Sequence, residues 1–234
     1  MNIALLTAAG VGSRMHQEIP KQFIHINNKP VILYTLEAFQ QSPLIDEIIT
    51  VSLENWKDML WAYAKQFGIT KLKYIVNGGA TGQESILRGL LELQKEHNQT
   101  DVVMVHDGNR PMISQEIIED SLAVYNKYGS AVAAIPCVEA IFKSDDGISS
   151  DMAIPREKLF RTQTPHTYTL GDLLQAHREA DEQNIYNTTA SCVLMQKLGK
   201  TVFFSKGSEK NLKITTSADI ETFIAYLSTK NNVR

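Results

Sequence analysis

Residues 3–15 read IALLTAAGVGSRM, a short apolar run that leads directly into a loop of small residues. An apolar run of this length is typical of a buried strand. Glycines in the loop allow a tight turn and let backbone N–H groups approach a ligand closely. The stretch therefore predicts a strand followed by a ligand-binding loop, the unit with which many α/β sheets begin.

Apolar runs and longer helical patterns continue to alternate along the chain. We expect further strands at 45–53, 74–76, 102–105 and 131–135, and helices at 31–41, 56–67, 84–95 and 115–127, the last capped by Ser114. This alternation favours a Rossmann-like α/β fold with a mainly parallel sheet and helices on both faces. In such folds ligands gather at the carboxyl ends of the strands.

The pattern changes between Pro136 and Gln163, where the chain is polar and rich in turn residues. The residues Asp145-Asp146-Gly147 predict a hairpin turn, so we interpret 136–163 as a projecting β-arm. A helix at 170–183, a short helix at 193–198, a strand at 202–205 and a final helix after Ser217 are expected to follow. Without repeats or a linker, residues 1–234 are predicted to form one domain that carries this arm.

Composition and charge exclude several classes of protein. The chain has 234 residues and a formal net charge of -3, without the basic excess that a nucleic-acid-binding protein needs. No apolar stretch is long enough to cross a bilayer, and the chain enters its first strand without a leader-like segment. Two cysteines are too few for a disulfide framework. We expect a soluble, cytoplasmic protein with neither a nucleic acid nor a membrane as partner.

Two basic residues accompany the first loop. Arg14 lies within it, and Lys21 follows in the sequence PKQF at 20–23. Met15 stands where a dinucleotide-binding GxGxxG motif needs its third glycine, and no Gly-Lys-Ser/Thr of a Walker A loop follows. A single lysine is usually a solvated surface residue. Beside a glycine loop, however, cations of this kind are suited to stabilising the oxygens of a triphosphate.

Six motifs follow one another in a family-like order. They are AAGVGSRM at 8–15, PKQF at 20–23, the glycine pair 78–79 with Ser85, VHDGNRP at 105–111, QTP at 163–165 and NLKITT at 211–216. Together they resemble the cytidylyltransferase family that makes CDP-methylerythritol and, in close relatives, CDP-ribitol. The resemblance covers nearly the whole chain. It implies transfer of CMP from CTP to a polyol phosphate with release of pyrophosphate, by a homodimeric enzyme that uses Mg²⁺.

The resemblance also implies a role for individual residues. The catalytic cations would be Arg14, Lys21 and Lys213, the last at the end of the final strand. Nucleotide binding would fall to Ala8, Ala9, Gly10, Gly12, Gly78, Gly79, Ser85 and Asp107. Binding of the polyol phosphate would involve Arg110, Ala140, Arg156, Thr164 and Asn187. Asp107, at the carboxyl edge of the sheet, is also the expected ligand of Mg²⁺. Arg110 could equally support its loop through a buried ion pair, while His106 and Asp219 are interpreted as structural.

Departures from the family pattern cluster where the acceptor would bind. Glu139-Ala140 replaces an Asp-Thr pair, Asn187-Thr188 replaces Thr-Asp, and Gly82 replaces an arginine. Loss of a hydrogen-bonding hydroxyl can change the discrimination between polyols strongly. The acceptor therefore stays open between methylerythritol 4-phosphate and ribitol 5-phosphate, and with it the pathway, which is isoprenoid or cell-surface polymer synthesis.

Two other functions are compatible with the same sheet. One is a non-catalytic nucleotide-binding module, and the other is a sugar-1-phosphate nucleotidyltransferase. The non-catalytic module is disfavoured because the chain keeps all four charged residues of the motifs, which are Arg14, Lys21, Asp107 and Lys213. A site that had lost its activity would be expected to lose such clustered charges first.

Overall fold

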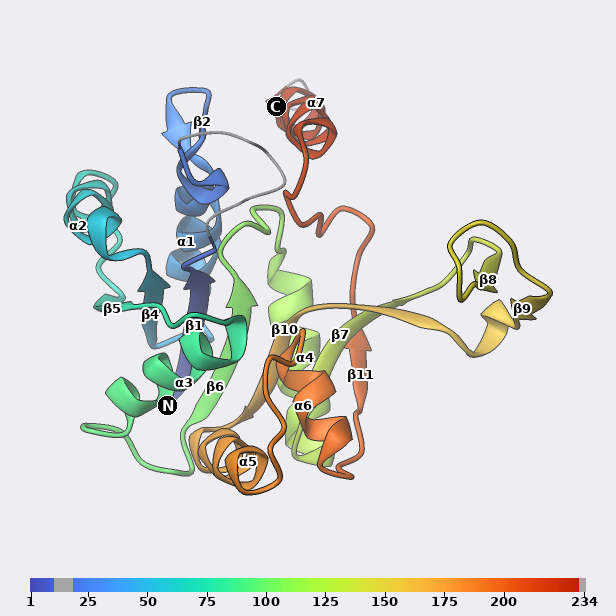
Figure 1. Ribbon diagram of the computed structural model, residues 1–234. Coiled ribbons are helices and arrows are strands. Elements are labelled where there is room, and N and C mark those ends of the chain that lie inside the picture. The colour runs from blue at the N-terminus through green and yellow to red at the C-terminus, as the bar shows by residue number, and fades with distance from the viewer. Residues whose placement is uncertain (11–18, 232–234) are drawn as a thin grey trace.

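The computed structural model describes residues 1–10 and 19–231 and is organised around a seven-stranded mixed sheet (Figure 1). Its strand order is β11-β7-β10-β6-β1-β4-β5. The strands are β1 (Asn2–Ala8), β4 (Glu47–Ser52), β5 (Leu72–Asn77), β6 (Val102–Asp107), β7 (Ala131–Pro136), β10 (Phe160–Thr169) and β11 (Phe204–Lys206). β1 pairs in parallel with β4 and β6, as the alternation of strands and helices predicts.

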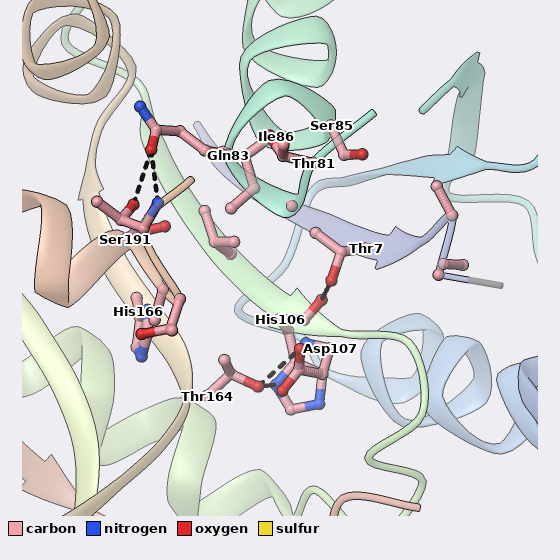
Figure 2. A pocket seen from close by; sticks show the side chains of 18 of the residues that line it. Thr7, Thr81, Gln83, Ser85, Ile86, His106, Asp107, Thr164, His166 and Ser191 are labelled. Atoms are coloured by element: carbon pink, nitrogen blue, oxygen red, sulfur yellow. Dashed lines mark hydrogen bonds between the residues drawn. The ribbon is translucent and has the colours of Figure 1, made fainter. Parts of the chain in front are cut away.

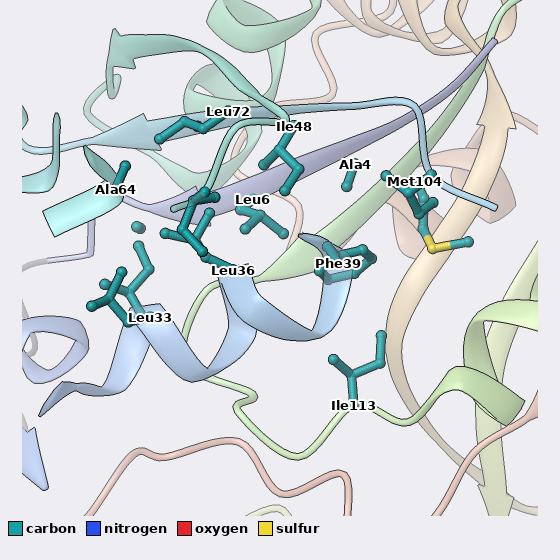
Figure 3. Close-up of a cluster of buried hydrophobic side chains, with 14 of the residues drawn as sticks. Ala4, Leu6, Leu33, Leu36, Phe39, Ile48, Ala64, Leu72, Met104 and Ile113 are labelled. Atoms are coloured by element: carbon teal, nitrogen blue, oxygen red, sulfur yellow. The ribbon is translucent and has the colours of Figure 1, made fainter. Parts of the chain in front are cut away.

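Successive side chains of β1 point to opposite faces of the sheet and enter two separate cores. Ala4 and Leu6 pack beneath α1, α2 and α4, and Figure 3 shows this core with Phe39 of α1 against the strands. Ile3 and Leu5 pack beneath α3, α5 and α6. These helices are α1 (Val31–Gln41), α2 (Lys57–Gln66), α3 (Gly82–Leu93), α4 (Gln115–Tyr128), α5 (Leu170–Glu182) and α6 (Ser191–Lys197). The expectation of helices on both faces is thus confirmed.

The helix ends carry the signals that the sequence suggested. The hydroxyl oxygen of Ser114 accepts a hydrogen bond from the Ile117 N–H and caps α4. At the other end, Gly129 has a φ of 81°, the left-handed conformation that ends a helix at little cost for glycine. Helix α3 begins two residues earlier than expected, because the Thr81 side chain caps it by accepting from the Glu84 N–H.

Strand β10 was not expected from the sequence. It runs antiparallel between β6 and β7, and its pairing with β7 shifts between Thr162 and His166. The preceding polar stretch concealed it, because its first three residues are exposed and continue that stretch, whereas residues 163–168 are buried. Irregular pairing of this kind re-aims side chains and is frequent beside active sites. Here it directs Gln163 and Thr164 toward the cavity described below.

The predicted arm projects away from the sheet (Figure 1). Its tip is an antiparallel pair, β8 (Ile141–Lys143) with β9 (Met152–Ile154), followed by a short 3-10 helix at Arg156–Lys158. The connection at 144–151 is wider than the expected tight turn, and Asp146 accepts hydrogen bonds from the backbone N–H groups of Ile148 and Ser149.

The remaining elements lie beyond the carboxyl edge of the sheet. Helix α7 (Ser217–Asn231) buries Phe223 against Val31 of α1, beside a small pair formed by β2 (His25–Ile26) and β3 (Lys29–Pro30). Two further 3-10 helices occur at Lys21–Phe23 and Glu54–Trp56. In residues 1–10 and 19–231, none of the helices has the length and apolar character needed to cross a bilayer.

Candidate active site

A cavity of about 680 Å³ opens at the carboxyl ends of β1 and β6 (Figure 2). Its walls come from the loop after β1, the first turn of α3, the end of β6 with the residues that follow it, the segment from β10 to α6, and Lys213. This is the edge at which the parallel strands were expected to gather a ligand.

A buried side chain holds the start of the loop after β1 through hydrogen bonds to its backbone. The Gln22 side-chain amide donates hydrogen bonds to the carbonyl oxygens of Ala8 and Gly10, and its side chain is almost completely buried. These carbonyls are therefore satisfied inside the protein. Lys21, the neighbour of Gln22, lines the cavity together with Ala8, Ala9 and Gly10.

The glycine pair after β5 approaches this loop closely. A Cβ atom on Gly78 would lie 2.2 Å from the Cβ of Ala9, so that only glycine fits. The Gly79 N–H donates to the Ser85 hydroxyl oxygen at 3.0 Å, which ties the turn to α3. Gly79 and Ser85 both line the cavity. The pair therefore allows two backbone segments to form one continuous wall.

Asp107, at the end of β6, forms ion pairs with two basic side chains at the cavity. One carboxylate oxygen lies 3.0 Å from Arg110 Nε, and the other lies 2.9 Å from Lys213 Nζ. Burial alone would raise the pKa of the Asp107 carboxyl, but the positive charges of Lys213 and Arg110 outweigh it and hold the pKa well below its usual range. The carboxylate is therefore ionised at neutral pH.

A hydroxyl on β10 links the backbone of Asp107 to a buried histidine. The Asp107 N–H donates to Thr164 Oγ1 at 3.0 Å, and the same hydroxyl lies 3.0 Å from His106 Nδ1. Burial lowers the pKa of His106 to about 3, so its ring is neutral and Nδ1 can accept the hydroxyl proton. His106 is fully buried. Its contacts agree with the structural interpretation given to it.

Lys213 lies in the loop between β11 and α7, and the expectation that it ends a strand is wrong. The loop is held by polar contacts: Arg110 donates to the Asn211 carbonyl oxygen at 2.7 Å, and the Asn211 side chain donates to the Thr164 carbonyl oxygen at 2.8 Å. The Ile214 N–H donates to the Asn109 carbonyl oxygen at 2.9 Å. Arg110 therefore supports this loop as well as pairing with Asp107.

The far wall of the cavity comes from residues 188–194 and is tied to α3 by one side chain. Gln83 Oε1 accepts from both the N–H and the hydroxyl of Thr188, at 2.9 and 3.0 Å, and its amide nitrogen donates to the Ile185 carbonyl oxygen at 2.9 Å (Figure 2). His166 and His177 also line the cavity. Burial lowers the pKa of each to about 4, so both rings are neutral at pH 7.

With this geometry in view, comparison with known proteins identifies the family. The family model described as 2-C-methyl-D-erythritol 4-phosphate cytidylyltransferase matches residues 2–229. The chain belongs to this cytidylyltransferase family. It is 39% identical over 232 residues to the ribitol-5-phosphate cytidylyltransferase of Lacticaseibacillus paracasei, covering 98% of this chain and 99% of that one. It is also 39% identical over 222 residues to the 2-C-methyl-D-erythritol 4-phosphate cytidylyltransferase of Clostridium acetobutylicum, covering 94% of each.

The fold of this cytidylyltransferase also matches the folds of solved crystal structures. The crystal structure of 4-diphosphocytidyl-2C-methyl-D-erythritol synthase from Anaerococcus prevotii superposes with a TM-score of 0.82 at 24% identity, covering 97% of this chain and 98% of that one. The α/β fold expected from the sequence, with its mainly parallel sheet, is thus confirmed.

Most residues that the sequence nominated for the cytidylyltransferase site meet in the cavity. Those lining it are Ala8, Ala9, Gly10, Lys21, Gly79, Ser85, Asp107, Arg110, Thr164 and Lys213. Gly78 packs behind the wall, and Ala140, Arg156 and Asn187 are not among the lining residues of their own chain. Gly12 and Arg14 lie outside the described residues. Sequence reasoning missed Gln22 and Gln83; the first stands within a motif, whereas nothing in the sequence marks the second.

Asp107 is the side chain of this site best suited to a metal. In the described part of the chain, no group of three or more His, Cys, Asp or Glu side chains could hold a metal ion. Mg²⁺, however, is commonly bound by one or two carboxylates together with substrate phosphates and water. The residues of this cavity therefore fit a Mg²⁺ ion that is held by the Asp107 carboxylate together with substrate phosphates and water.

Proposed function

We propose that this enzyme transfers CMP from CTP to the phosphate of methylerythritol 4-phosphate or ribitol 5-phosphate and releases pyrophosphate. The observation that carries the proposal is the meeting of Lys21, Lys213 and Asp107 with the glycine turn in one cavity. Close backbone walls suit a nucleoside, and adjacent cations suit a triphosphate. Membership of the family over residues 2–229 agrees with this chemistry.

On this proposal the nucleoside lies between the loop after β1 and the turn at Gly78 and Gly79. Exposed backbone groups there can read the exocyclic amine that distinguishes cytosine from uracil. Gln22 and Ser85 keep both segments in place before the ligand arrives. Because these contacts already hold residues 8–10 and the turn at Gly78 and Gly79, little ordering of those segments opposes binding.

The cations act on the reacting phosphates. An oxygen of the acceptor phosphate attacks the α-phosphorus of CTP in line, and the bond from this phosphorus to the bridging oxygen of pyrophosphate breaks. Lys21 and Lys213 stabilise the charge that builds on the α-phosphate and on the leaving group, and Arg14 is proposed to join them. A phosphate monoester is largely ionised at neutral pH, so no general base is needed.

Mg²⁺ is the cofactor we propose. When bound, it would neutralise charge on the triphosphate oxygens, and Asp107 is the residue that would hold it. The low pKa of Asp107 keeps this carboxylate ionised and available. Since both of its oxygens pair with cations, a metal would share the carboxylate with Lys213 or Arg110.

We further propose that residues 1–234 form one domain and that two copies associate through the arm at 136–163. Several large apolar side chains of the arm and its base are left exposed, a condition that burial in a partner would relieve. They are Val138, Phe142, Ile148, Met152, Phe160 and Phe204. Arg156 sits on this arm, away from the cavity of its own chain, and would bind the acceptor phosphate in the partner's site.

A pyrophosphate-release assay tests the function directly. The enzyme, with CTP and Mg²⁺, is offered methylerythritol 4-phosphate, ribitol 5-phosphate and other polyol phosphates, with UTP and GTP as nucleotide controls. We expect release that requires CTP and one of the two named acceptors. CTP binding without turnover on any acceptor would favour the non-catalytic module instead, and turnover with a sugar 1-phosphate would favour the other nucleotidyltransferase class.

A further inference from the structure

Two segments that lie far apart in the sequence meet at the cavity. They are the first turn of α3 and the loop at 185–188, and the Gln83 side chain joins them. Gln83 and Thr188 both line the cavity. The wall at 188–194 is therefore tied to the helix that follows the glycine turn.

Gln83 fills this contact with neutral hydrogen bonds. Its carboxamide oxygen accepts from the Thr188 N–H at 2.9 Å and from the Thr188 hydroxyl at 3.0 Å. Its nitrogen donates to the Ile185 carbonyl oxygen at 2.9 Å. The amide thus spans the base of the loop, and its donor and acceptor ends cannot be exchanged without breaking these bonds.

The loop at 185–188 is anchored at its start to α5, where the Ile185 N–H donates to the Ala180 carbonyl oxygen at 2.8 Å. Asn184 and Asn187 both adopt left-handed backbone conformations, with φ of 56° and 54°. Such conformations persist in residues other than glycine where the surroundings impose them. Thr188 then leads directly into Thr189 and Ala190 of the far wall. A contact that fixes Thr188 therefore fixes the wall that faces the cations.

We propose that Gln83 is a positioning residue that clamps the acceptor wall, residues 188–194, to the nucleotide-binding turn. The inference rests on the proposed function, because its consequence is acceptor binding. The clamp is uncharged, so the position of the wall should be insensitive to salt.

The test compares Gln83→Ala with Gln175→Ala. Gln175 also makes three side-chain hydrogen bonds, but on the exposed surface of α5. We expect Gln83→Ala to raise the KM for the acceptor about tenfold, with a much smaller change in the KM for CTP. Gln175→Ala should leave both unchanged. Equal increases in both KM values, or an unchanged acceptor KM, would overturn the clamp.

A measurement that does not depend on catalytic activity tests the Gln83 clamp separately from the proposed function. The Thr188 amide donates to Gln83, so its hydrogen exchange, followed by NMR, should be slow in the wild type and about tenfold faster in Gln83→Ala. If the wild type transfers no CMP to any acceptor, the proposed function fails, and the exchange rate alone decides whether the clamp exists. Equal rates in both proteins would overturn it.

Discussion

The residues proposed to bind the nucleotide lie at the ends of central strands, whereas those proposed to bind the acceptor lie mostly on loops and on the arm. On the nucleotide side, Ala8 and Asp107 end β1 and β6, and a buried glutamine and a capped helix support the intervening turns. On the acceptor side, Ala140 and Asn187 are exposed or irregular in backbone. The family motifs are intact among the residues proposed to bind the nucleotide. The departures from the family pattern cluster near the residues proposed to bind the acceptor. Parts carried by the buried sheet can vary little, while loops can be exchanged to suit another acceptor.

The largest effect is expected on the nucleotide side, from Lys21→Ala. Loss of a cation that acts mainly on the transition state should lower kcat about a hundredfold or more, with a smaller change in CTP binding. Steady-state kinetics together with a CTP titration measure both quantities. Near-normal turnover would remove Lys21 from the mechanism.

The arm offers the next largest effect, through mixed dimers. Lys21→Ala and Arg156→Ala subunits should each be inactive as homodimers. In a C2 dimer, a mixed pair concentrates both lesions in one site and leaves the other site intact. Reassociation of the two variants should therefore return about half of wild-type activity per heterodimer. If heterodimers form, as native mass spectrometry would show, and no activity returns, Arg156 serves its own subunit.

Alanine substitutions of Gly78 and Gly82 test whether the close approach of the glycine turn to the loop after β1 is needed. Gly78→Ala places a Cβ 2.2 Å from that of Ala9, whereas the same change at Gly82 meets no described atom within 4 Å. Overpacking of this kind costs about 2 kcal/mol, so the KM for CTP should rise roughly thirtyfold for Gly78→Ala. Gly82→Ala should stay close to wild type. Equal KM values for both variants would show that the two walls do not need the close approach.

The smallest effect of this set is expected on the acceptor side, in substrate choice. Ala140→Thr combined with Asn187→Thr restores hydroxyls where the family pattern has them. One or two altered hydrogen bonds should shift the ratio of kcat/KM between ribitol 5-phosphate and methylerythritol 4-phosphate by about tenfold. Competition between the two acceptors in one reaction measures this ratio. An unchanged ratio would show that neither position tunes the acceptor.

The same contrast explains what the sequence could predict. Alternating apolar runs placed β1, α1 and α4 correctly, and the motifs pointed to residues most of which line one cavity, because strand ends and small-residue loops are local patterns. Strand β10 was missed, since its first three residues are exposed and continue the polar stretch before it, and its partners β6 and β7 are distant in sequence. Gln83 was missed for a similar reason. Its role depends on a contact with Thr188 across 105 positions, which no local pattern reveals.

The neutral histidines beside the ionised Asp107 have a consequence for the pH–rate profile. The pKa values of His106, His166 and His177 lie at about 3, 4 and 4, and that of Asp107 is lowered below its usual range. These groups therefore do not change protonation above about pH 5, roughly one unit above the highest of those values. A phosphate monoester loses its second proton near a pKa of about 6. A rise in kcat/KM across that range would thus belong to a substrate phosphate. If it belongs to the acceptor, its midpoint should follow the pKa of whichever polyol phosphate is supplied, whereas a midpoint that stays fixed would belong to the terminal phosphate of CTP.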